Sequence, residues 1–386
     1  MPRVYQPRTT LRGRIVAVRR TSRDDSVPAA VVDVGWVNGL AAIRSLGRAG
    51  IRVLAVDHRP SALGFRSRYA ERFLSPDPHQ DETRFVAFVR ALGQVVVFPT
   101  HDEQLNLIAR HLGDLDVLAP FPAWDILERV QSKRVQLEEA EAAGVDIPRT
   151  AYPGTVEEAG AAAKELGFPL LVKPEHPIGF KQRFRRQAFR CENQVELAEA
   201  YERASDFALM LQELIPGGDD TLYSVGSYLT REGRPLGVFS GRKLRQTPPG
   251  IGTCRIGEAV WVQESVDAAL RLLQGFGYFG LSQVEFKRDP RDGRFKLMEI
   301  NPRLWQWHGL AAACGVDLPR LAYADLTGES PSEARMNGHG KRWAITLLPG
   351  ERPTPQRPPY ADAVFAADDL KPAAVHLVRV VRSALG

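Results

Sequence analysis

Apolar and polar positions along the first third of the chain follow a strand–helix–strand rhythm. Segments with helical spacing lie at 40–46 and 102–112. Between and around them are short continuous apolar runs at 29–34, 51–57, 95–100 and 116–122. Apolar runs of this length alternating with helices are typical of buried parallel strands joined by crossovers. The pattern therefore predicts a doubly wound α/β domain over residues 31–125.

From about residue 126 the pattern changes to one that favours antiparallel strands. A helix is predicted over 126–148, ending near Gly144 and followed by an extended stretch. Strands at 224–230 and 236–245, and at 281–289 and 293–301, are each separated by a short turn and form two predicted hairpins. Further strands are expected at 168–174 and 208–215, and helices at 155–166, 193–204, 262–275 and 370–384. The sequence thus predicts an α+β region over 126–330 and a C-terminal part, 331–386, that is irregular up to about 360.

Composition narrows the class of protein. The 386 residues are 44% hydrophobic and 25% charged, which is ordinary for a globular chain and excludes a disordered or fibrous one. No apolar run approaches the roughly 20 residues that span a bilayer, so we expect no membrane association. The three cysteines are far apart and form neither a zinc nor a disulfide pattern, which favours a reducing cytoplasm: Cys191, Cys254 and Cys314.

The net charge of +5 is concentrated in one segment. Residues 1–30 hold seven arginines and two aspartates, so the rest of the chain is neutral overall. We expect a solvated basic extension there, with an Arg-rich transit peptide as the alternative, and no nucleic-acid partner. Residues 181–190 carry five positive charges and no negative one, which suits a small polyanion better than a long nucleic acid.

The second hairpin carries a candidate metal site. Glu299 and Asn301 are two residues apart on one strand and so share a face, and the turn brings Glu285 to the level of Glu299. Two carboxylates and an amide oxygen suit a hard cation such as Mg²⁺ or Mn²⁺. An ordinary solvent-facing surface is the alternative, but Glu299 lies between apolar neighbours, where an unpaired carboxylate is costly.

Other candidates remain open on the residues alone. Lys173 and Lys243 lie on predicted strands, and each is either a solvated strand end or a positive charge beside a polyphosphate. Lys133 lies on a predicted helix. The segment 208–220 is either a plain loop or a linker strand that pairs with a purine edge. The glycines of GWVNG (35–39) open a helix and serve either anion binding or close packing.

Taken together, these segments resemble the ATP-grasp superfamily over residues 31–330. The most specific part is VEFKRDPRDGRFKLMEINPR (284–303), which is similar to the metal-binding hairpin of that family. Before it, in the family's order, come Ser132–Lys133, PLLVKP with Lys173, LQELIPGGDD (211–220) and SGRKLR (240–245). The resemblance implies an ATP-grasp fold: the N-terminal parallel-sheet domain, then two α+β subdomains whose antiparallel sheets sandwich ATP. The smaller, a lid, would cover about 150–212 and the larger, metal-binding one about 213–330.

The resemblance also implies roles for individual residues. Those expected to bind ATP are Lys133 and Lys173 at the phosphates, Gln212 at the adenine amino group where the family often has Glu, Glu213 and Leu214 through their backbone, and Asp219 or Asp220 at the ribose. Those expected to hold two metal ions are Glu285, Glu299 and Asn301. Those expected to stabilise the transferred phosphoryl group are Arg242, Lys243 and Arg303.

The implied activity is ADP-forming: ATP phosphorylates a carboxylate, and an amine then displaces phosphate to give an amide or peptide bond. The N-terminal part is similar to D-aspartate ligase-like carboxylate–amine ligases. The residues expected to contact an amino-acid or peptide substrate are Asp102 and Glu103, beside Thr100 and His101, although a helix cap explains these four equally well.

The sequence departs from the family after Lys173, where a Gly-rich loop is replaced by HPIGFKQRFRRQAFR (176–190). This segment is either a lid that uses side-chain charge or a site for an acidic substrate, with Lys181 and Arg185 as contacts. Together with Gln212, it leaves a catalytically impaired nucleotide-binding regulatory or scaffold protein as the alternative function. If the chain assembles, we expect a homodimer.

Overall fold

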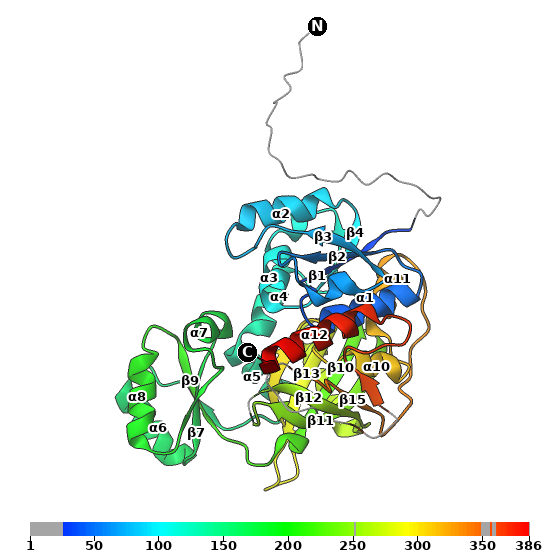
Figure 1. Cartoon of the computed structure of the whole chain (residues 1–386). Coiled ribbons are helices and arrows are strands. Elements are labelled where there is room, and N and C mark those ends of the chain that lie inside the picture. Colours follow the sequence, from blue (N-terminus) through cyan, green and yellow to red (C-terminus); the bar gives the residue numbers. More distant parts are fainter. Residues whose placement is uncertain (1–25, 251, 349–355, 357–359, 386) are drawn as a thin grey trace.

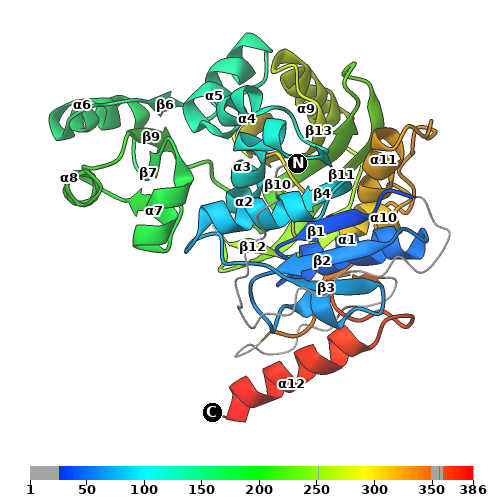
Figure 2. The same ribbon diagram turned by 90° about the horizontal axis from the view of Figure 1, so that it is seen from above.

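The computed structural model describes residues 26–250, 252–348, 356 and 360–385. Most of the basic extension expected over 1–30 lies outside these residues. The described strands form three sheets, and the smallest of these, with helices α6 (Val156–Leu166) and α8 (Gln194–Arg203), forms a lobe to one side of the other two (Figures 1 and 2). No helix among the described residues is long and apolar enough to cross a membrane.

The N-terminal sheet is parallel throughout, which confirms the doubly wound prediction. Its strands are β1 (Ala29–Val32), β2 (Val53–Asp57), β3 (Ala70–Leu74), β4 (Val95–Pro99) and β5 (Val117–Leu118), in the order β3-β2-β1-β4-β5. Its helices are α1 (Val37–Arg48), α2 (Glu82–Ala91) and α3 (Asp102–Arg110). The sheet begins at 29, two residues inside the expected extension. The order reverses between β1 and β4, the place where open sheets of this type bind ligands.

Two elements of this sheet were missed. The sequence pattern did not predict β3 or α2, because β3 is a partly exposed edge strand without a continuous apolar run. The single helix predicted over 126–148 was also wrong. It is two helices, α4 (Trp124–Gln131) and α5 (Lys133–Ala142), because Ser132 adopts an extended backbone and its side chain accepts a hydrogen bond from the Val135 amide. This break places Lys133 at the first position of α5.

The small lobe is an antiparallel four-stranded sheet. Its strands are β6 (Thr150–Ala151), β7 (Leu170–Pro174), β8 (Phe189–Cys191) and β9 (Leu209–Glu213), in the order β6-β9-β7-β8. Its helices are α6 (Val156–Leu166), α7 (Pro177–Phe184) and α8 (Gln194–Arg203). The segment after Lys173, expected as a loop, therefore contains a helix. Phe180 anchors α7, since its ring lies 4.7 to 5.4 Å from those of Phe184, Phe189 and Phe207.

The large sheet has seven strands in the order β14-β13-β10-β11-β12-β15-β16. They are β10 (Leu222–Leu229), β11 (Pro235–Thr247), β12 (Thr253–Ala259), β13 (Gly280–Arg288), β14 (Phe295–Asn301), β15 (Arg342–Ala344) and β16 (Tyr360–Asp362). Both predicted hairpins are present, as β10–β11 and β13–β14. β12 was missed, and the stretch 331–360 is not wholly irregular because β15 and the start of β16 lie in it.

The two faces of this sheet have different coverings. Val225, Val284 and Phe286 pack in one apolar cluster with helix α9 (Gln263–Gly275). On the other face Trp305 lies against Gly226, and a second cluster joins Trp305 to α1 and to α10 (Gly309–Ala313) and α11 (Leu318–Leu326). The C-terminal helix α12 (Lys371–Leu385) lies against the 3₁₀ turn Leu63–Arg66 of the N-terminal part. The N-terminal part is thereby fixed against the large sheet, next to the end of β14.

Candidate active site

The β13–β14 hairpin brings its polar side chains to one face. Glu285 lies directly opposite Glu299, and Gln283 lies opposite Asn301. The Asn301 Nδ2 donates to Glu299 Oε1 and to Gln283 Oε1, each at 3.2 Å, and Gln283 Nε2 donates to Glu285 Oε1 at 2.8 Å. The register expected from the sequence is therefore present. Gln283 was missed, although its place two residues before Glu285 could have revealed it, since alternate residues of a strand share a face.

Cations from two other elements neutralise the two carboxylates. Lys243 on β11 donates to Glu285 Oε2 at 2.9 Å, and Lys133 Nζ lies 3.6 Å from Glu299 Oε2. Burial raises the pKa of Glu285 despite Lys243. Burial also acts to raise the pKa of Glu299, but Lys133 and Lys243 outweigh it, so that pKa is lowered. Facing carboxylates repel each other, so this face requires positive charge.

Arg303 lies at the end of the same face and is held from the N-terminal part. Its Nε and Nη2 donate to the two oxygens of Asp102 at 2.6 and 2.9 Å, and Nη2 also donates to Asn301 Oδ1 at 3.2 Å. Asp102 stands in the first turn of α3, at the C-terminal end of β4. The structure thus brings Asp102, expected as a substrate contact, to a group expected to act on phosphate.

Lys173 and Gln212 form a pair in the small lobe. Lys173 Nζ donates to Gln212 Oε1 at 2.7 Å, and Gln212 Nε2 donates to Thr150 Oγ1 at 3.0 Å. Burial and the neighbouring charges of Lys133 and Lys287 lower the pKa of Lys173 to about 7, although Glu299 opposes them. Lys173 therefore lies close enough to the hairpin face for the charge of Glu299 to affect its pKa.

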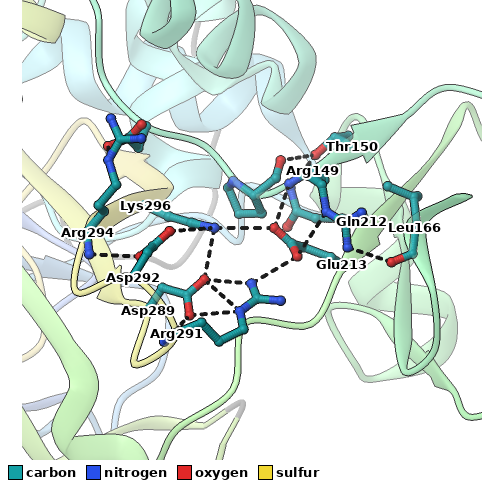
Figure 3. A network of polar contacts seen from close by, with 12 residues as sticks. Arg149, Thr150, Leu166, Gln212, Glu213, Asp289, Arg291, Asp292, Arg294 and Lys296 are labelled. Atoms are coloured by element: carbon teal, nitrogen blue, oxygen red, sulfur yellow. Dashed lines mark hydrogen bonds and ion pairs between the residues drawn. The ribbon is translucent and has the colours of Figure 1, made fainter.

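Glu213 is the centre of a separate ion cluster that joins β9 to the β13–β14 turn (Figure 3). Its oxygens accept from the Arg149 amide at 2.9 Å and from Arg291 Nη2 at 2.9 Å, and Lys296 Nζ lies 3.5 Å away. Arg291 and Lys296 also pair with Asp289. The backbone amide of Glu213 donates to Arg149 and that of Leu214 donates to Pro169, so neither amide points to an open edge.

The two aspartates expected at the ribose differ in their surroundings. Asp219 accepts hydrogen bonds from the amides of Gln246 and Gly250 at 2.7 and 2.9 Å and from the Gln246 side chain at 3.0 Å. Asp220, its neighbour in the 3₁₀ turn Asp219–Thr221, is exposed. Asp219 thus stabilises the β11 end, and Asp220 is the better placed of the two for a ligand.

Some expected residues do not join the hairpin face. Arg242 pairs with Glu258 at 2.8 Å, and it lies on the opposite face from Lys243 because successive strand residues alternate. Glu103 contacts His79 at 3.0 Å and Gln182 of α7 at 3.3 Å. Lys181 lies near enough to Asp102 to lower its pKa, a smaller effect than those of burial and Arg303.

Two further candidate residues are Arg185 and His101. Arg185 is exposed and ends α7 with a left-handed backbone, φ 53°. His101 lies 3.3 Å from Asp33, at the switch point of the parallel sheet.

Comparison with known proteins identifies the fold. The family model of the carbamoyl-phosphate synthase L chain ATP-binding domain matches residues 261–324, which contain the β13–β14 hairpin and Arg303. The biotin carboxylase of Campylobacter jejuni, solved as a beta-gamma-ATP complex, superposes with a TM-score of 0.67 at 18% identity, over 81% of this chain and 74% of that one. The chain has an ATP-grasp fold.

Other similar proteins are equally distant in sequence. N5-carboxyaminoimidazole synthetase from Staphylococcus aureus has a TM-score of 0.64 at 13% identity, covering 80% of each chain. D-aspartate ligase of Enterococcus faecium is 26% identical over 249 residues, which are 60% of this chain and 58% of the ligase. The large chain of carbamoyl phosphate synthase from Thermus thermophilus is 24% identical over 310 residues, 74% of this chain and 29% of the synthase. The chain thus spans 58% of the length of this ligase and 29% of that of this synthase, in both cases less than two thirds.

Proposed function

We propose that this ATP-grasp protein is a Mg²⁺-dependent ligase that uses ATP to activate a carboxylate as an acyl phosphate and joins it to an amine. The observation that supports it most is the hairpin face, where two opposed carboxylates and Asn301 lie among lysines from two other elements. Facing carboxylates with neighbouring lysines suit a site that binds a metal–polyphosphate complex, since the carboxylates can bind the metal and the lysines can bind the phosphate oxygens.

The donor set fits Mg²⁺ when a nucleotide is bound. Among the residues that the structure describes, no three His, Cys, Asp or Glu side chains gather as a complete metal site. Mg²⁺ is commonly held by one or two carboxylates together with substrate phosphates. Glu285, Glu299 and Asn301 would therefore hold the ion beside the phosphates. When bound, it supplies positive charge that offsets the charge of the phosphate oxygens.

The remaining residues would bind the nucleotide. Lys133 and Lys243 pair with the carboxylates, and together with Lys173 of the small lobe they would contact phosphate oxygens. Gln212, beside Lys173, would meet the adenine amino group, and the exposed Asp220 would meet the ribose. Lys243 would exchange its bond to Glu285 for a phosphate oxygen at little electrostatic cost, because the metal then neutralises that carboxylate.

The chemistry requires positioning and charge stabilisation more than a protein nucleophile. A substrate carboxylate oxygen attacks the γ-phosphorus, the bond to the bridging β–γ oxygen breaks, and ADP leaves. The amine then attacks the acyl carbonyl, phosphate departs with the bonding electrons, and the amine loses a proton. Arg303 would bind the oxygens of the transferred group in both steps.

The substrates would be a small carboxylic acid and an amine, with an amino acid or peptide as one of them. The similarity to D-aspartate ligase supports this class. The edge of the parallel sheet at Thr100–Glu103, next to Arg303, would receive the acid or the amine, with Lys181 and Arg185 of the small lobe bordering it. The three cysteines are free and buried, which supports a reducing compartment such as the cytoplasm.

The test is a turnover assay with ATP, Mg²⁺ and pooled amino acids, followed by mass spectrometry of the condensed product. The wild type should release ADP and phosphate in equal amounts with a new amide. Glu299→Ala should abolish release, whereas Glu264→Ala, an exposed acid in the first turn of α9, should not change it. Equal release by Glu299→Ala would refute the site. Tight MgADP binding without turnover on any acid–amine pair would instead favour a regulatory nucleotide-binding protein.

A further inference from the structure

Arg303 is fixed by a contact that crosses between two parts of the fold. It follows β14 of the large sheet, whereas Asp102 begins α3 just after the C-terminal end of β4 in the parallel sheet, 201 residues away in sequence. Nε and Nη2 meet the two carboxylate oxygens at 2.6 and 2.9 Å, a bidentate fork that fixes the plane of the guanidinium as well as its position. The Arg303 side chain is only 16% exposed.

The same contact leaves part of the guanidinium available. Nη2 reaches Asn301 Oδ1 at 3.2 Å while it remains paired with Asp102, so Arg303 lies beside the candidate metal ligands without leaving the fork. Among the described residues no partner of Nη1 is seen, and its two N–H groups are free for a ligand. Without such a contact, a long arginine side chain would lose considerable rotamer freedom when a ligand holds it in one geometry.

We propose that Asp102 is a positioning residue, which holds Arg303 in the orientation that meets the transferred phosphoryl group. The inference rests on the proposed function for the role of Arg303. It also assigns Asp102 differently from the sequence expectation of a substrate contact, since each of its oxygens accepts a hydrogen bond from Arg303. The edge of the parallel sheet then helps to set the geometry of phosphoryl transfer in the neighbouring sheet.

Asp102→Asn should release the guanidinium, because a neutral amide offers one acceptor oxygen in place of two charged ones. We expect kcat to fall by about 100-fold, the size of effect produced by misplacing a catalytic group by about 1 Å, with KM for ATP changed less than about threefold. Asp102→Glu keeps the carboxylate and should recover part of kcat. Asp125→Asn, which removes an exposed acid from the first turn of α4, is the matched control.

A second measurement separates this inference from the proposed function. Phenylglyoxal modifies accessible guanidinium groups, and peptide mass spectrometry reports the rate at Arg303 alone. We expect Asp102→Asn to speed modification of Arg303 several-fold, Asp102→Glu to give an intermediate rate, and Asp125→Asn to match the wild type. This result needs no turnover, so it stands even if no ligase substrate is found.

The outcomes divide clearly. Faster labelling together with lower kcat and partial rescue by Asp102→Glu supports the positioning role. An unchanged labelling rate in both Asp102 variants would overturn it, and so would a rise in the KM of the carboxylate or amine at constant kcat, which would make Asp102 a substrate contact. If Asp102→Asn does not fold, a wild-type labelling rate and wild-type kcat in a folded Asp102→Ser variant would overturn it equally.

Discussion

Replacing Gln212 by glutamate should change how nucleotide binding depends on pH. Lys173 donates to Gln212 at 2.7 Å, so the nearest partner of this lysine is neutral. Burial, with the charges of Lys133 and Lys287, lowers the pKa of Lys173 to about 7, and Glu299 only partly opposes this. A free protein at pH 7 therefore holds Lys173 charged in about half of its molecules.

A polyphosphate next to Lys173 favours its charged form. Nucleotide binding at pH 7 should therefore take up about half a proton, and affinity should fall about tenfold per pH unit from about pH 7 up to the higher pKa of the bound state. In Gln212→Glu a carboxylate replaces the amide, and an opposite charge at this distance typically raises a lysine pKa by about 1 to 3 units. Proton uptake near pH 7 should then nearly vanish.

The assay is calorimetric titration with MgADP in two buffers of different ionisation enthalpy. The difference in apparent heat gives the number of protons taken up, and repeating it from pH 6 to 9 gives the affinity profile. Gln274→Glu, which adds the same charge at an exposed position of α9, is the control. Binding by the wild type with no proton uptake and a constant affinity from pH 7 to 9 would refute the reasoning, as would full uptake retained by Gln212→Glu.

Two further predictions concern stability. Glu213→Gln should lower the free energy of unfolding in urea by about 1 to 3 kcal/mol, because the buried Glu213 carboxylate loses its charge-assisted bonds to the half-exposed Arg149 and Arg291. Burial acts to raise the pKa of Glu213, but its hydrogen bonds and the nearby cations outweigh burial, so the pKa is lowered. The stabilisation by Glu213 is therefore present above the ordinary carboxyl pKa and is lost in acid. A difference in unfolding free energy between Glu213→Gln and the wild type that widened below pH 4 would contradict this. Gly226→Ala would place a Cβ 1.9 Å from the Trp305 ring and should cost about 1 to 3 kcal/mol with altered tryptophan fluorescence, whereas Gly113→Ala, which meets nothing within 4 Å, should leave both unchanged.

Local features of this protein were predictable because their causes are local. The turn at 290–293 and the approximate level of Glu285 with Glu299 were predicted from the sequence. The sequence did not indicate the β-bulge next to Glu285, which shifts the register from Phe286 opposite Leu297 to Glu285 opposite Glu299. The parallel sheet was equally predictable, since buried strands and their crossover helices carry distinct apolar periods. Elements without a clear period were missed, such as the exposed edge strand β3.

Contacts between distant segments were not predictable in this way. Nothing in the sequence near Asp102 indicates that it pairs with Arg303, and nothing near Glu213 indicates Arg291 as its partner. Arg242 and Lys243 are neighbours in sequence with the same charge, yet only Lys243 faces the carboxylates.

The sequence by itself determined the two hairpins and the main strands of the parallel sheet, and it identified Glu285, Glu299 and Asn301 as members of the carboxylate face. The tertiary structure alone decided which cations reach that face, because packing sets the approach of Lys133 from α5 and of Lys243 from β11. It also decided that Asp102 holds Arg303, because only the docking of the parallel sheet against the large sheet brings these two residues together. Periodicity acts within one element, whereas charge pairing acts through space between elements, and the fold alone sets those distances.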